Sequence, residues 1–277
     1  MAVLGAAPTS VYPQIPITQS MTWVPEMDGD VCIHLVGAGG GGAGRADSYV
    51  YGGGGAGYVK IVKLAVTTSG SFTLVVGVGG AGGRSNVDVG GISGCGVDGG
   101  DTTIAGTGIS GTITAGGGGG GRQGWAVGTA GTTSVGSQSF TTVARTGGVG
   151  GGNCGSGGAV GIHGTGTAGS ASYGQIGGMS DAVADGMVSG WGYLVGGAVD
   201  TTVWGNAGQS STGTSGNSAG ALSGGAGSYI NSNDGGSYGG AGTIGGGGGA
   251  GYNAANIAYS YGGRGGDGII VIQYLPW

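Results

Sequence analysis

The sequence contains very little charge. Only 7 of its 277 residues are lysine or arginine and 12 are aspartate or glutamate, so charged residues make up 7% of the chain, where roughly 25% is typical. Disordered chains usually combine a high net charge with low hydrophobicity, whereas here the net charge is -5 and the mean hydropathy is positive. We therefore expect a folded protein, and the scarcity of basic residues disfavours nucleic-acid binding.

Cysteine, proline and long apolar runs are also scarce. Cys32, Cys95 and Cys154 form no C-x-x-C pair and fit neither a disulfide scaffold nor a zinc site. Five prolines are too few for collagen, which also requires a strict Gly-X-Y repeat. The first 20 residues lack a basic start and are broken by prolines, and no apolar run approaches the roughly 20 residues of a membrane helix. These absences predict a soluble protein made in a cytoplasm.

Motifs for catalysis are weak or missing. Residues 77–83, GVGGAGG, match G-x-G-x-x-G after an expected strand, but no helical pattern follows, which disfavours a nucleotide site. Neither His34 nor His163 lies beside a nucleophile motif, and Asp28 and Asp30 are the one close carboxylate pair that stands out. A lone strand histidine is usually structural. We expect no enzymatic activity, no cofactor and no metal site.

One stretch matches a calcium-binding repeat. Residues 262–270, GGRGGDGII, fit the nonapeptide G-G-x-G-x-D-x-U-x with Asp267 at the ligand position. Such repeats bind calcium when they are stacked in tandem, and the sequence has one copy. A role for Asp267 in capping or turning the chain into a final strand is favoured over cation binding, which the sequence leaves open.

What the chain does have is glycine, at 82 residues. Glycine loses more backbone freedom on folding than any other residue and has no side chain to bury. In an ordered glycine-rich region the N–H and C=O groups must therefore pair with each other, and each such hydrogen bond contributes about 0.5 to 1.5 kcal/mol net. We expect extended, three-fold glycine-rich segments that pack side by side and bond laterally.

Alternating apolar residues between the glycine runs indicate strands. Residues 31–36 alternate. Residues 58–66 are followed by TTSG and by residues 71–78, SFTLVVGV, in which Phe72, Leu74 and Val76 fall on one face, a pattern typical of a hairpin. Because Lys60 and Lys63 are three residues apart, they would fall on opposite faces of a regular strand. This spacing predicts a bulge or a largely solvated edge.

Further short strands complete an all-β prediction. Residues 101–106 and 111–116 predict a second hairpin, and residues 268–275 predict a last strand, which must pair with an earlier one. The expected domains are an amino-terminal attachment segment, a small β-sandwich and a glycine-rich bundle inserted into that sandwich. Their boundaries are 1–22 for the segment, 23–115 plus 266–277 for the sandwich, and 116–265 for the inserted bundle.

Aromatic residues in the expected insertion are candidates for binding. Tyr252, Tyr259 and Tyr261 are predicted to fill gaps between glycine layers. The others lie in inserts between the glycine runs. Exposed aromatic residues in inserts that also carry asparagine, serine and threonine make good recognition surfaces. The predicted receptor-binding residues are Trp125, Trp191, Tyr193, Trp204, Tyr229 and Tyr238.

A series of motifs resembles the glycine-rich domain of bacteriophage tail fibres and receptor-binding adhesins. The likeness spans about residues 21–275 and is carried in order by MTWVPEMDGDVCIHLVGAGGGGAG, GGGGAGYVKIVKLAV, FTLVVGVGGAGG, GGDTTI, TAGGGGGG and GGRGGDGIIVIQY. This resemblance implies a polyglycine-II-like bundle whose loops at one end contact a host receptor. Residues 1–20 do not look like the tryptophan-bearing attachment region of those adhesins.

These observations favour a phage tail-fibre tip or adhesin in the virion, made in the host cytoplasm. Its expected partners are a bacterial outer-surface protein or polysaccharide and other tail-fibre or virion proteins, and a homotrimer is one option for its assembly. The alternative is a purely structural spacer of a virion or of the extracellular space. An ice-binding protein is disfavoured, because regular threonine ranks are not evident.

Overall fold

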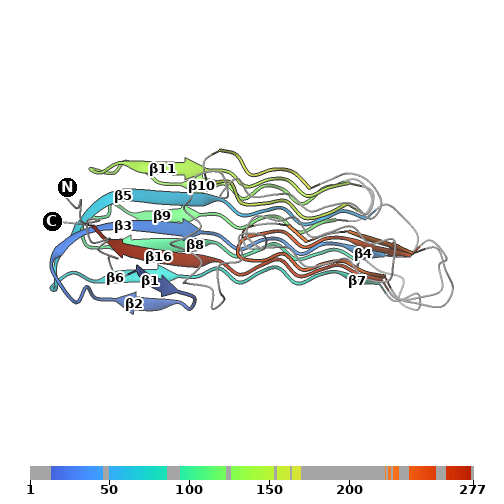
Figure 1. Cartoon of the computed structure of the whole chain (residues 1–277), viewed down its shortest axis with the longest axis horizontal. Helices are drawn as coiled ribbons and strands as arrows, with labels where there is room; N and C mark the ends of the chain where they lie inside the picture. The colour runs from blue at the N-terminus through green and yellow to red at the C-terminus, as the bar shows by residue number, and fades with distance from the viewer. Residues whose placement is uncertain are drawn as a thin grey trace, which may run out of the picture.

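The computed structural model describes an elongated all-β molecule (Figure 1). It describes residues 14–45, 50–85, 94–122, 126–152, 155–162, 164–169, 222, 224–225, 227–230, 237–253 and 260–275. Within these ranges there is no helix, and hence none that is long and apolar enough to cross a membrane. The all-β prediction is confirmed for this part of the chain.

Two five-stranded antiparallel sheets form one end of the molecule, called here the sheet end. The first sheet has the order β1 (Gln14–Ile17), β16 (Ile269–Tyr274), β3 (Gly29–Val36), β5 (Tyr58–Val66) and β11 (Thr142–Arg145). The second has the order β10 (Thr133–Ser134), β9 (Thr112–Ala115), β8 (Thr102–Gly106), β6 (Phe72–Val75) and β2 (Met21–Trp23).

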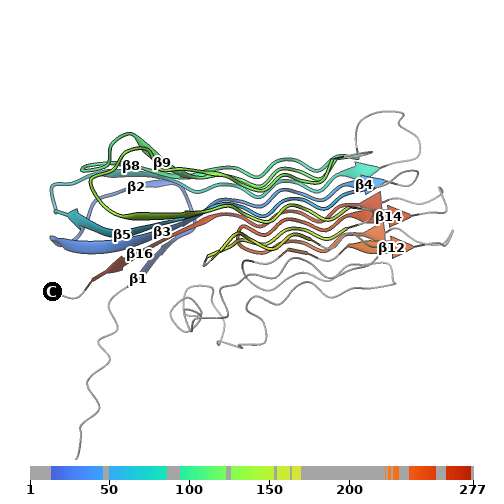
Figure 2. The ribbon, with the colours of Figure 1, turned by 90° about the horizontal axis from the view of Figure 1, so that it is seen from above.

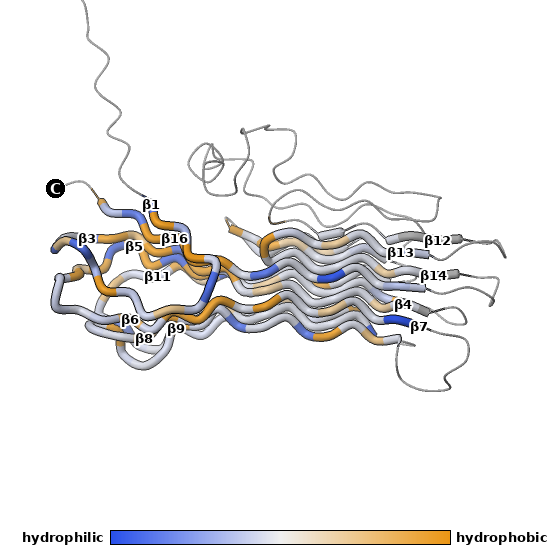
Figure 3. The backbone as a smooth tube through the Cα atoms, turned by 90° about the horizontal axis from the view of Figure 1, so that it is seen from below, coloured by the Kyte–Doolittle hydropathy of each residue, from blue (hydrophilic) through white to orange (hydrophobic). Residues whose placement is uncertain are grey.

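The two sheets share one hydrophobic core, consistent with the predicted sandwich-like arrangement. The first sheet contributes Ile33 and Leu35, the second contributes Phe72 and Ile104, and all four side chains are almost fully buried. The orange, hydrophobic colouring in Figure 3 is concentrated here, whereas most of the bundle is pale. Fully burying one such side chain stabilises the fold by about 1.5 to 3 kcal/mol.

Three details of the strand predictions are confirmed. β16 pairs with β3, and β8 forms an antiparallel hairpin with β9. The register between β3 and β5 shifts between Val31 and Ile33, so β5 carries the bulge that the lysine spacing indicates. Because of this bulge, Ile61 and Leu64 are both buried while Lys63 is exposed.

The predicted hairpin of residues 58–66 and 71–78 is wrong. β5 pairs with β3 and β11, whereas β6 pairs with β2 and β8 in the other sheet. The turn between β5 and β6 therefore crosses from one sheet to the other. Both strands bury their apolar faces in the common core, and this burial replaces direct pairing between them.

Several strands of the two sheets continue into extended glycine-rich segments, which run side by side as a bundle (Figures 1 and 2). In residues 37–44 the amides donate in rotation to three antiparallel neighbours, with N···O distances of 2.8 to 3.1 Å, so every third amide meets the same neighbour. The carbonyls of the same residues accept amides from three other segments. The three segments that accept these amides are residues 50–57, 94–100 and 262–268. The three segments that donate to these carbonyls are residues 77–83, 116–121 and 246–251.

Glycine is required in the bundle by space rather than by an unusual φ angle. A β-carbon built on Gly40 would collide with the carbonyl oxygen of Gly119, and one on Gly41 with that of Ala81. Within the described residues, positive φ values occur at turns such as Gly108 and Gly245 and not at Gly40 or Gly41. Segments that approach this closely on every side leave no volume for a side chain.

The bundle draws on the whole chain rather than on one stretch of it. Residues 37–44 and 50–57, which are bonded to neighbouring segments on several sides, lie in the part expected to form the sandwich. Conversely, β10 and β11 belong to the sheets although they lie in the expected insertion 116–265. β1 and β2, which lie wholly or partly in the expected attachment segment 1–22, pair with β16 and β6.

Candidate functional site

The end of the bundle farthest from the sheets, called here the distal end, carries two small three-stranded sheets (Figure 2). One has the order β12 (Ser228–Ile230), β14 (Gly251–Asn253) and β4 (Gly44–Arg45). The other has the order β13 (Ser237–Tyr238), β15 (Ser260–Tyr261) and β7 (Arg84–Ser85). Each of these six strands ends or begins a glycine-rich segment.

Chain reversals gather at the distal end. All six strands of these two sheets have one end that adjoins residues outside the described ranges. Hydrogen bonds join further segment ends to them, such as Gly44 to Gly94 and Ala250 to Gly155. In the sequence these segment ends are separated by residues 46–49, 86–93, 123–125, 153–154, 231–236 and 254–259, which lie outside the described ranges. One end of the bundle thus collects segment ends that lie far apart in the sequence.

A row of three side chains crosses the second distal sheet. Tyr238 pairs in register with Tyr261, and Tyr261 pairs with Arg84. The two tyrosine rings are stacked, with centroids 5.0 Å apart and planes 1° from parallel, and the Arg84 guanidinium carbon lies 5.2 Å from the centroid of Tyr261. Aromatic pairs contribute about 0.5 to 1.5 kcal/mol beyond area burial, and an exposed cation–π contact about 0.5 to 1 kcal/mol. Arg84, Tyr261 and Tyr238 are called the first row.

The same residue order recurs in the neighbouring sheet. In register, Arg45 pairs with Tyr252 and Tyr252 pairs with Tyr229, and these three positions are called the second row. The two sheets lie against each other, since β4 contacts β7, β14 contacts β15 and β12 contacts β13. Tyr252 is half-buried against a small cluster of Ala43, Val50 and Ala250.

The structure describes only two of the six predicted receptor-binding residues. Trp125, Trp191, Tyr193 and Trp204, together with the expected gap-filler Tyr259, lie outside the described residues. Tyr229 is placed by its backbone in β12, and Tyr238 is 45% exposed in β13.

Sequence reasoning missed the arginines and the alignment of the two rows. Arg45, Arg84 and Arg122 each follow a glycine run directly, and Tyr238, Tyr252 and Tyr261 each border one. A large residue at the end of a glycine run marks the point where the bundle stops, and this signal could have identified the positions. Which rows they form depends on strand register, which no local pattern encodes.

Carboxylates line the flank of the bundle. Asp98 accepts a hydrogen bond from the Gly120 amide at 2.7 Å, and Asp101 accepts one from Gly117 at 2.8 Å. The two aspartates are three residues apart, as are the two amides, which matches the three-residue period of the segments. Among the described residues, these side chains satisfy amides for which no main-chain acceptor lies within reach.

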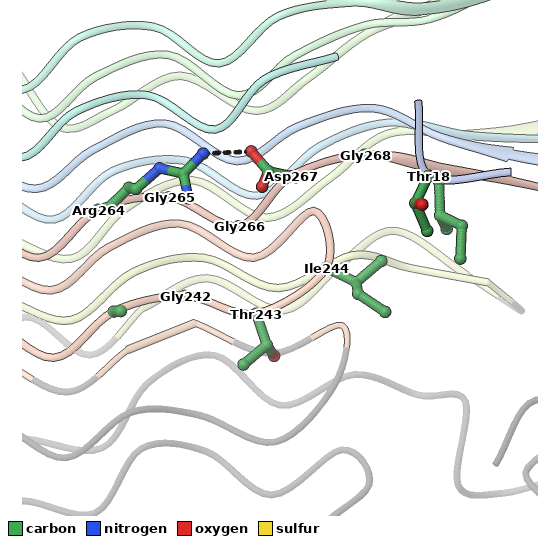
Figure 4. A pocket seen from close by; sticks show the side chains of 11 residues that line it. Thr18, Gly242, Thr243, Ile244, Arg264, Gly265, Gly266, Asp267 and Gly268 are labelled. Atoms are coloured by element: carbon green, nitrogen blue, oxygen red, sulfur yellow. Dashed lines mark hydrogen bonds and ion pairs between the residues drawn. The ribbon is translucent and has the colours of Figure 1, made fainter. Parts of the chain in front are cut away.

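Asp267 does the same for a third segment. Its carboxylate accepts a hydrogen bond from the Gly79 amide at 2.7 Å and forms an ion pair with Arg264. Both side chains line a cavity of about 340 Å³ together with Thr18, Thr243 and Ile244 (Figure 4). No group of three or more potential metal ligands occurs among the described residues. The carboxylate caps an amide of the adjacent segment.

The histidine of β3 is part of the packing. His34 is 3% exposed, and its Nδ1 lies 2.7 Å from the Tyr58 hydroxyl while its Nε2 lies 3.4 Å from Cys32 Sγ. Burial, together with the positive charge of Lys60, lowers the pKa of His34 to about 3. Burial also raises the pKa of Cys32, so its thiol stays protonated at neutral pH.

Comparison with known proteins agrees with this architecture. The fold is an all-β, glycine-rich scaffold with a differentiated end, and the family model described as a glycine-rich domain matches residues 16–275. The chain belongs to this glycine-rich domain family. No curated protein matches the sequence significantly.

Proposed function

We propose that this protein is a receptor-binding adhesin or tail-fibre tip of a bacteriophage, with its receptor site at the distal end. The receptor in this proposal is a bacterial outer-surface protein or polysaccharide. The single observation that carries it is the concentration of segment ends and of the arginine–tyrosine rows at one end of the bundle. Binding residues commonly lie on loops that a rigid scaffold positions.

The bundle fits the scaffold role in this proposal. Its three-residue period and its hydrogen bonds in several lateral directions are the properties of a polyglycine-II lattice, as the family resemblance implies. A scaffold held by main-chain hydrogen bonds does not depend on the side chains of the connecting sequences, which are therefore free to vary. Receptor specificity then changes without refolding of the support.

The sheet end is the proposed site of attachment to the virion. β1, the first strand of the described chain, lies there at an edge of the first sheet. In this arrangement residues 1–20 tether the protein to other tail-fibre or virion proteins. Attachment at one end and recognition at the other place the receptor site at the tip.

Cell adsorption tests the proposal. The purified protein, labelled with a fluorophore, should bind in a specific and saturable way to some strains of a diverse bacterial panel. Changing Trp125, Trp191 and Trp204 together to alanine should abolish adsorption while leaving the far-UV circular dichroism spectrum unchanged. Absence of adsorption on every strain would favour the structural spacer. Adsorption that survives the triple change would remove these tryptophans from the site.

A further inference from the structure

The first row is built before any ligand arrives. Its tyrosine planes are 1° from parallel, and the guanidinium of Arg84 lies against the ring of Tyr261. All three residues belong to strands rather than to connections, so their order is fixed by backbone pairing. A ligand that meets such a surface orders few rotatable bonds on the protein side, which lowers the entropic cost of binding.

The two ends of the first row face solvent. Tyr238 is 45% exposed on β13, which is an edge strand of its sheet among the described residues. Arg84, at the other end of the row, is also exposed, while Tyr261 between them is half-buried. The row therefore offers an aromatic side chain, the hydroxyls of two tyrosines and a guanidinium along one line.

We propose that the two rows form a platform for an acidic polysaccharide, which deepens the proposed function by naming the receptor class. Tyr238 stacks on the apolar C–H face of a sugar ring, and Arg84 donates two parallel hydrogen bonds to a carboxylate or phosphate on the chain. The tyrosine hydroxyls bond to ring hydroxyls between these two anchors.

Repetition within the site favours this ligand over a folded protein. Arg45, Tyr252 and Tyr229 hold register positions equivalent to those of the first row, in a sheet that contacts it strand by strand. A polysaccharide presents the same group at regular intervals, and so it can satisfy two like rows at once. The surface of a folded protein has no such repeat. Two linked contacts also raise the effective affinity above that of either row alone.

An array of purified bacterial capsular polysaccharides and lipopolysaccharides, acidic and neutral, tests the assignment with the full chain. The wild-type protein should bind acidic glycans, and raising the salt concentration should weaken that binding because exposed charges are screened. Binding should strengthen when fragments become long enough to span both rows. Failure to bind any acidic glycan, or equal binding to neutral ones, would overturn the proposal.

Point variants then locate the site. Arg84→Gln and Tyr238→Ala should each weaken binding to the best acidic glycan by about tenfold or more, since each removes one anchor. Arg264→Gln is the matched control, because Arg264 is 52% exposed but lies on the flank of the bundle beside Asp267. Equal loss in the control, or no loss in the two row variants, would contradict the platform. Thermal unfolding of each variant establishes that the fold is retained.

Treated cells separate this inference from the proposed function. If adsorption is abolished by periodate oxidation of surface glycans and survives protease treatment, both stand. If protease abolishes adsorption and periodate does not, the receptor is a protein, and the glycan platform is wrong while the adhesin stands. If no strain adsorbs the protein, the adhesin itself is wrong.

Discussion

In the two five-stranded sheets the buried residues are mainly isoleucine, leucine, valine and phenylalanine, whereas in the bundle they are chiefly glycine and alanine. The sheets are stabilised by apolar surface removed from water. The bundle is stabilised by main-chain hydrogen bonds that run in several directions from each segment. One chain thus combines a core made of side chains with a lattice made of backbone.

The difference teaches that glycine content alone does not indicate flexibility. A glycine-rich stretch is a flexible linker when its amides bond to water. Here the amides of residues 37–44 bond to three neighbouring segments in rotation, and so the same composition is ordered. The sheets supply the fixed starting points from which these segments run side by side.

The largest expected effect comes from adding one methyl group inside the bundle. Gly40→Ala should destabilise the protein by about 3 kcal/mol or more, because overpacking forces backbone shifts and the new β-carbon would meet the carbonyl group of Gly119. Chemical denaturation of the purified variant measures this. Gly152→Ala is the control, since its β-carbon would approach only the ring of Tyr51, at 3.3 Å. Equal stability of the two variants would disprove close packing at Gly40.

A smaller effect is expected from pH, because lowering the pH should destabilise the sheet that contains His34 more than the bundle. The pKa of His34 is about 3 in the folded protein and about 6.5 when unfolded, so the unfolded state binds the additional proton between these values. As far as His34 is concerned, the free energy of unfolding is at its maximum above about pH 6.5 and falls as the pH decreases towards 3. Between pH 7 and pH 5 the loss should be about 2 kcal/mol.

The control for this pH effect is His34→Gln, which has no titrating group at this position. Its unfolding free energy should change less than that of the wild type between pH 7 and pH 5, measured by urea denaturation. Identical pH profiles would mean that His34 is not held neutral by burial. The bundle should show little of this dependence, since its lateral hydrogen bonds join main-chain groups.

The smallest effect is expected on the flank of the bundle. Asp98→Ala and Asp101→Ala each remove the acceptor for one amide, and each should destabilise by about 0.5 to 1.5 kcal/mol. Amide hydrogen exchange at Gly120 and Gly117 should accelerate in the corresponding variant. Asp28→Ala is the control, because Asp28 bonds to the Thr68 amide at the sheet end. Unchanged exchange at both glycines would show that the carboxylates do not protect them.

Much of the sheet end could be predicted from sequence. The alternation in residues 31–36 predicts β3, residues 58–66 predict β5, and the lysine spacing predicts the bulge, because side-chain periodicity reports which face of a strand is buried. The same periodicity does not report which sheet a strand joins. The pattern of residues 71–78 therefore predicts a hairpin with β5, although β6 belongs to the opposite sheet.

The bundle and the candidate site were harder to predict. Lateral bonding follows from the need to pair glycine amides, but which segments are neighbours depends on geometry that leaves no trace in side-chain type. The rows at the distal end show the same limit. Tyr238 and Tyr229 could be selected as recognition residues, yet their alignment with Arg84 and Arg45 follows from the register between distant strands.

The three-residue period of the bundle constrains how this chain can change in length. Deleting one residue from a segment such as 37–44 would turn every later amide by a third of a turn, so that each would face a different neighbour. Deleting or inserting three residues restores the original directions and only moves the tip inward or outward. The reach of the molecule should therefore evolve in steps of one helical turn, applied to many segments together.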